Sequence, residues 1–186
     1  MAIFGSRCTQ GHSVSLGEVV LNIGLGIVTR KQGEGMNSVC AYHSSLVYVT
    51  SAAILILVLT CSGEILEVAI LSQVCWLDVR GSLDISELSP EVVYEIVYVF
   101  MLTEAASGWE LPIRLILALP DGRVQASQVS LLEKPRGQWM ELSVGNFQRK
   151  NGELGEVSFI IREHGGHWKQ GLVIKGAVIR PIQTTL

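Results

Sequence analysis

The sequence predicts an all-β protein, an antiparallel β-sandwich of the jelly-roll type. Short segments rich in β-branched and aromatic residues follow one another from about residue 64 to the C-terminus. Turn sequences such as Pro120-Asp121-Gly122 and Asn151-Gly152 separate these segments. No convincing amphipathic helix interrupts them, so about seven strands are expected to pack as two sheets.

The first predicted strands differ in how clearly they alternate. Segment 74–80 is rich in β-formers and is expected to stop at Gly81. Segment 92–102 alternates two apolar sets, and 111–119 places Leu and Ile side chains on one face. The turn at 120–122 then makes 123–131 the hairpin partner of 111–119. Segment 64–71 fits a short helix or a strand equally well.

Three further strands complete the predicted sandwich. Segment 139–144 alternates apolar and polar residues, as half-buried strands do, and segment 157–161 places Val157, Phe159 and Ile161 on one face. Segment 172–179 is apolar on both faces, which is typical of a strand in the centre of a packed sheet. It follows a polar loop in which Gly165 and Gly166 permit a tight turn. These features place the end of the chain inside a sheet.

Composition excludes several classes of protein. Hydrophobic residues make up 48% of the 186 residues and charged residues 17%, which argues against disorder. The formal net charge of −3 provides no basic field for a nucleic acid. The four cysteines form no CxxC pair, and their spacing favours reduced thiols in a cytosolic protein.

Residues 1–63 differ from residues 64–186, and we treat them as two regions. All four tryptophans lie in the second region. The first holds a 16-residue apolar run, 46–61, which is shorter than the roughly 20 residues of a membrane-spanning helix. The run favours a buried strand or helix, with a membrane anchor as the alternative.

The residues that offer chemistry lie near the C-terminus, and none forms a known catalytic motif. His164 and His167, with Glu163, offer three zinc ligands, but a glycine-rich loop would hold them poorly. Glu156 and Glu163 are seven residues apart, so in an unbroken strand they face opposite ways. They converge only if the strand ends early or bulges. A binding role is therefore favoured over catalysis.

The tryptophans also favour binding, because an aromatic face packs against the apolar face of a sugar ring. Trp109 and Trp168 lie in polar segments that contain or adjoin glycine, which makes them the candidates for exposed faces. For any single tryptophan, core packing is the more frequent alternative. Trp76 lies within an apolar segment and is expected in the core. Trp139 begins a strand, and the sequence does not decide its exposure.

The chain from about residue 67 to 181 resembles the plant phloem protein 2 lectins, also called Nictaba-like lectins. The matching motifs, in order, are VCWLDVRG at 74–81, LSP at 88–90, GW at 108–109, LPDG at 119–122, KPR at 134–136, GE at 155–156, GGHWK at 165–169, GLVIKG at 171–176 and IRP at 179–181. No F-box motif precedes them, so the resemblance is to the stand-alone lectins.

The resemblance implies a jelly-roll lectin that binds N-acetylglucosamine oligomers and N-glycan cores. It implies no metal or organic cofactor, a cytoplasmic and nuclear location, and a homodimer. In this family two glutamates are implicated in sugar binding, and they correspond to Glu156 and Glu163. Trp168 and Trp109 are the candidate stacking faces.

The sequence departs from the family at its N-terminus. Family members carry two implicated tryptophans there, whereas residues 1–63 contain none. Sugar binding is then impaired, or the N-terminal region replaces the missing strand. The alternative function is a non-lectin protein-interaction module on the same sandwich.

Overall fold

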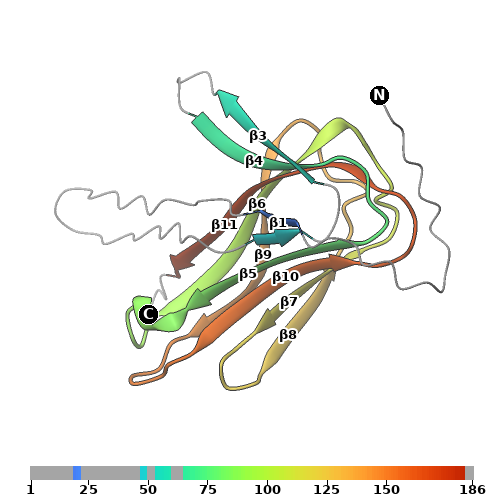
Figure 1. The fold of residues 1–186 in the computed structure, drawn as a ribbon. Helices are drawn as coiled ribbons and strands as arrows, with labels where there is room; N and C mark the ends of the chain where they lie inside the picture. The colour runs from blue at the N-terminus through green and yellow to red at the C-terminus, as the bar shows by residue number, and fades with distance from the viewer. Residues whose placement is uncertain (1–18, 22–46, 50–52, 60–64, 183–186) are drawn as a thin grey trace.

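The protein is a two-sheet antiparallel β-sandwich, which confirms the predicted fold class (Figure 1). The computed structural model describes residues 19–21, 47–49, 53–59 and 65–182. Sheet A contains, in spatial order, β1 (Val19–Leu21), β2 (Val47–Val49), β5 (Leu77–Asp84), β10 (Glu156–Glu163), β7 (Ile113–Ala118) and β8 (Val124–Val129). Sheet B contains β3 (Ala53–Leu59), β4 (Ile65–Leu71), β11 (Gln170–Pro181), β6 (Val93–Ser107) and β9 (Trp139–Gln148). A 3₁₀ turn, η1 (Ile85–Glu87), follows β5.

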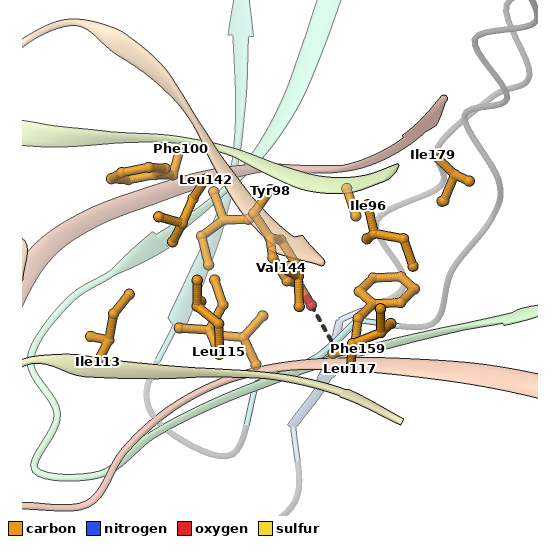
Figure 2. Close-up of a cluster of buried hydrophobic side chains, with 14 of the residues drawn as sticks. Ile96, Tyr98, Phe100, Ile113, Leu115, Leu117, Leu142, Val144, Phe159 and Ile179 are labelled. Carbon is orange, nitrogen blue, oxygen red and sulfur yellow. Dashed lines mark hydrogen bonds between the residues drawn. The ribbon is translucent and has the colours of Figure 1, made fainter. Parts of the chain in front are cut away.

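The core lies between the inner faces of the two sheets, where alternate residues of each strand meet (Figure 2). Tyr98 on β6 is fully buried, and its hydroxyl donates a hydrogen bond to the carbonyl oxygen of Phe159 on β10 at 3.1 Å. Burial raises the pKa of Tyr98 far above its ordinary value, and the charge of Asp78 adds to this. The hydroxyl therefore remains a donor that links sheet B to sheet A.

Strand β5 differs from its prediction at both ends. It begins at Leu77 rather than Val74 and continues through Gly81 to Asp84. The strand tolerates Gly81 because the ring of Phe159 lies over it, and a Cβ there would be 2.2 Å from Phe159 Cε2. This glycine makes room for a neighbouring ring and does not end the strand.

Other predicted elements are confirmed. Segments β7 and β8 form the expected hairpin, with Gly122 at φ +86° in its turn. The final strand, β11, lies inside sheet B between β4 and β6. The ambiguous segment at 64–71 contains strand β4.

The apolar run at 46–61 contains strands β2 and β3. Strand β2 pairs with β5 in sheet A, and β3 pairs with β4 in sheet B. The rest of the run, and Cys8, Cys40 and Cys61, lie outside the described residues. In the described part of the chain no helix is long and apolar enough to span a membrane.

Candidate functional site

One end of the sandwich gathers most of the residues that the sequence singled out. Three segments meet there: 74–76 before β5, 108–112 between β6 and β7, and 164–169 between β10 and β11. Val74 and Lys169 join two of them through paired backbone hydrogen bonds of 2.9 and 2.8 Å. We call this region the loop end.

A buried ion pair fixes the loop at 164–169. Glu163 Oε1 accepts a 2.6 Å hydrogen bond from the backbone N–H of Gly165, and Oε2 forms an ion pair with Lys169 Nζ. The ammonium also donates to the backbone carbonyls of His167, at 3.0 Å, and Cys75. The side chains of Glu163 and Lys169 are 6% and 0% exposed. Glu163, which precedes the loop, and Lys169, its last residue, are thus held together by a buried ion pair.

This arrangement makes Glu163 a structural group at the loop end. Removing one partner of a buried ion pair typically costs about 3–5 kcal/mol, because the remaining charge is left unpaired. The carboxylate is committed to Lys169 and Gly165, so it presents little surface to a ligand. Glu163 therefore acts by positioning the loop.

Segment 108–112 supports the same loop from below. His167 Nε2 donates a 2.9 Å hydrogen bond to the carbonyl oxygen of Gly108. Gly108 has φ +81°, and a Cβ there would lie 2.0 Å from the carbonyl oxygen of Trp168. Trp109 is 1% exposed, and its indole Nε1–H donates to the carbonyl oxygen of Gln170 at 3.0 Å. The expectation that Trp109 exposes a stacking face is thus wrong, because its ring fills the core under the loop.

Two tryptophans at the loop end are about half exposed. Trp168 is 45% exposed and Trp76 is 52% exposed. Trp76 was expected in the core, but it precedes β5 and is in phase with the outward-facing residues of that strand. Its ring lies 5.8 Å from the ring of His164. The loop end therefore presents aromatic surface from two segments that are hydrogen-bonded to each other.

His164 connects this aromatic surface to a charged network on sheet A. Its Nε2 is 3.5 Å from Asp78 Oδ2, and Asp78 also accepts from Arg80 Nε at 2.7 Å and Arg162 Nε at 3.3 Å. Burial opposes ionisation of Asp78 most strongly. The Arg80 hydrogen bond and the charges of Arg80, Arg162 and His164 outweigh it, so the pKa of Asp78 is lowered.

Glu156 lies far from the loop end. Strand β10 runs without a break from Glu156 to Glu163, so seven residues separate them by roughly 23 Å. Glu156 is exposed on the outer face of sheet A, opposite Asp84, whereas Glu163 follows the buried series of Val157, Phe159 and Ile161. The structure does not bring the two glutamates together.

The possible zinc ligands are also engaged elsewhere. Glu163 pairs with Lys169, His167 bonds the Gly108 carbonyl, and His164 faces Trp76 and Asp78. Among the described residues, no group of three or more His, Cys, Asp or Glu side chains is arranged to hold a metal ion.

Sequence reasoning missed Trp76, His164, Asp78 and Arg162 as members of one cluster. A signal was present, because Trp76, Asp78 and Arg80 alternate with the buried Leu77 and Val79. That alternation marks an outward-facing series, but the pairing with β10 that completes the cluster is not visible in the sequence.

The fold and the loop end define a two-sheet β-sandwich with an exposed aromatic surface. The family model for phloem protein 2 matches residues 59–181, and the chain belongs to the phloem protein 2 family.

Related proteins agree with this assignment. A lectin from Luffa acutangula is 48% identical over 122 residues, which cover 65% of this chain and 58% of that lectin. The chain thus matches less than two thirds of that lectin's length. Protein PHLOEM PROTEIN 2-LIKE A2 from Arabidopsis thaliana is 33% identical over 191 residues, covering 95% of this chain and 94% of that protein.

A solved structure shares the general sandwich shape at low similarity. The CBM22-1 xylan-binding domain of Paenibacillus barcinonensis Xyn10C is 14% identical, with a TM-score of 0.41, over 74% of this chain and 86% of that domain. A similarity this low carries no functional argument.

Replacing Asp78 with Asn tests the charged network by its pH dependence. The ordinary pKa of the group is 3.8 and the folded value is lower, so the stabilisation is complete above that range and is lost as the pH falls through the folded pKa. We expect the difference in free energy of unfolding between the parent and Asp78→Asn to be largest at pH 5 and to shrink towards pH 2. Urea denaturation across this window measures it.

Asp121→Asn is the control, because Asp121 is exposed and its ion pair with Arg123, at 2.6 Å, lies in a turn at the surface. We expect a small effect there. A stability difference for Asp78→Asn that stays constant from pH 5 to pH 2 would contradict the network's electrostatic role.

Proposed function

We propose that this protein is a lectin that binds N-acetylglucosamine oligomers and N-glycan cores. Membership of the phloem protein 2 family and the similarity to a Luffa acutangula lectin support a carbohydrate-binding protein. The N-acetylglucosamine preference follows the family resemblance of the sequence. We propose a binding role and no catalysis, and we keep the cytoplasmic and nuclear location as a prediction.

The observation that carries the proposal is the pair of half-exposed tryptophans, Trp76 and Trp168, on locked segments at the loop end. A pyranose ring presents a flat apolar face that packs well on an indole. Binding of the sugar costs less conformational entropy when the loop that carries the indole is already fixed before the sugar arrives. Here the Glu163–Lys169 ion pair supplies that fixation.

We assign different roles to the candidate residues. Trp168 is the stacking face, with Trp76 beside His164 as a second aromatic surface. Glu163 positions the loop, and Trp109 supports it through the Gln170 carbonyl. Glu156 lies at the other end of β10, where the structure gives it no contact with the loop end. The aromatic surface at the loop end takes the place of the missing N-terminal tryptophans.

Retention on a chitin column tests these roles. We expect Trp168→Ala to reduce retention strongly and Trp76→Ala to reduce it partly, because each removes aromatic surface. Glu163→Gln should also weaken retention by loosening the loop. The matched control is Trp139→Ala, which removes a 44% exposed tryptophan from β9.

Glu156→Gln separates this account from the family's two-glutamate site. We expect its retention to equal that of the parent protein. Loss of retention in Glu156→Gln with full retention in Trp168→Ala would overturn the assignment. A parent protein that is folded but never retained would overturn the lectin proposal itself.

A protein-interaction role is favoured by one further observation, the exposure of β8, which is the edge strand of sheet A among the described strands. Five of the six residues of β8 are exposed, and the strand carries no charged residue and no proline. Edge strands usually bear such residues to prevent pairing with other chains. We propose that two copies pair through this edge to form the homodimer that the family resemblance implies.

Ser127→Lys on β8 tests the dimer, because antiparallel pairing brings the two new charges close together. Light scattering of the parent protein should give twice the chain mass of 20.3 kDa, and the variant should give the single mass. The exposed Ser86 outside this edge provides the control Ser86→Lys. A monomeric parent, or a variant that remains dimeric, would exclude β8 as the interface.

A further inference from the structure

The outer face of sheet A carries a concentration of positive charge next to the loop end. The alternation of β5, β10 and β7 sends Arg80, Arg162 and Arg114 outward, while the neighbouring Val79, Ile161 and Leu115 are buried in the core. The strand register places Asp78, Arg162 and Arg114 side by side across three strands. We call Arg80, Arg114 and Arg162 the basic face.

The basic face contains one arginine that has no ion pair among the described residues. Asp78 is the carboxylate that pairs with Arg80 and Arg162, and it also faces His164. Arg114 forms no ion pair with any residue in the described part of the chain. Arg114 thus adds a positive charge that no described ion pair offsets, directly opposite Arg162, whose ion pair with Asp78 is 3.3 Å long.

The register also places two like charges directly opposite each other. Arg162 on β10 is the cross-strand partner of Arg114 on β7. Like charges in this position destabilise a sheet. A destabilising pair of this kind is often retained where the residues have a function. An anion held between the two guanidinium groups would convert the repulsion into attraction.

The chemistry of the basic face suits an acidic group on a larger ligand. Arginine guanidinium groups bind carboxylate, sulfate and phosphate oxygens in pairs, with a fixed planar geometry. The face is continuous with aromatic surface, because His164 lies 3.5 Å from Asp78 Oδ2 and its ring is 5.8 Å from that of Trp76. A sugar ring on the indole would therefore have arginines within reach of its substituents.

We propose that the basic face is an acidic-sugar subsite, which binds a carboxylate or sulfate ester on a saccharide seated at the loop end. This inference rests on the proposed lectin function in one respect, that the ligand is a saccharide. Trp76 provides the sugar contact, and Arg114 with Arg162 provides the contact to the acidic group. Neutral oligosaccharides then bind through the aromatic surface alone.

The test compares chitotetraose with its O-sulfated form, which carries anionic sulfate esters on the same saccharide chain, by titration calorimetry at low salt. We expect the sulfated probe to bind the parent protein about tenfold more tightly, as charge-assisted hydrogen bonds allow. Arg114→Gln should abolish this advantage and leave chitotetraose binding unchanged. Arg114→Lys should keep part of it, since the charge remains and the planar fork is lost.

Arg123→Gln is the matched control, because Arg123 is exposed in the β7–β8 turn, and its loss removes the same charge from a different surface. The sulfated probe should keep its advantage in this variant. If Arg114→Gln and Arg123→Gln reduced the affinity advantage of the sulfated probe equally, the advantage would be a general charge effect, and the proposed subsite would be overturned. Equal binding of the two probes to the parent protein would also overturn it, while leaving neutral sugar binding, and so the lectin proposal, intact.

Two further arms separate the sources of the anion. Inorganic sulfate should compete only at concentrations far above those of the sulfated saccharide, because it lacks the ring that Trp76 contacts. Competition at equal concentration would assign the face to a free anion and overturn the proposal. Tighter binding of a single-stranded oligonucleotide than of the sulfated probe would assign it to nucleic acid, with the same consequence.

Discussion

The loop end depends on one interaction, the buried ion pair between Glu163 and Lys169. The two residues lie on either side of a loop that contains two adjacent glycines, and such a loop has many conformations to lose on folding. The pair compensates by tying the carboxylate to Gly165 and the ammonium to the carbonyls of His167 and Cys75. Both ends of the loop and the segment before β5 are thereby joined.

Because the loop is fixed in this way, the tryptophans around it occupy two different environments, one buried and one exposed. Trp109 lies below the loop and holds the first residue of β11 through its indole N–H. Trp168 and Trp76 lie at its surface, where each side chain is about half exposed. The charged network around Asp78 then extends the surface along the outer face of sheet A. A rigid core and an exposed aromatic surface are thus built from neighbouring residues.

Strand alternation predicted much of this architecture. It predicted the sandwich, the β7–β8 hairpin, the central position of β11 and the opposite orientations of Glu156 and Glu163. The apolar character of its segment misplaced Trp76 in the core, although the alternation of β5 marks it as outward-facing. Trp109 lies between β6 and β7, where no strand alternation decides burial. Their positions depend on contacts with His164 and Gln170, which are distant in sequence. The partner of Glu163 was likewise not apparent, because a lysine in a polar loop is ordinarily expected in solvent.

The four tryptophans provide the most direct test of the central claim, that a locked loop presents Trp168 and Trp76 to a saccharide. Each indole N–H gives its own signal in an ¹⁵N-edited NMR spectrum, so chitotetraose can be titrated against all four at once. The account predicts shifts for Trp168 and Trp76, with Trp139 unchanged and Trp109 retaining its hydrogen-bonded signal. Shifts confined to Trp139 or Trp109, with Trp168 and Trp76 unaffected, would contradict it.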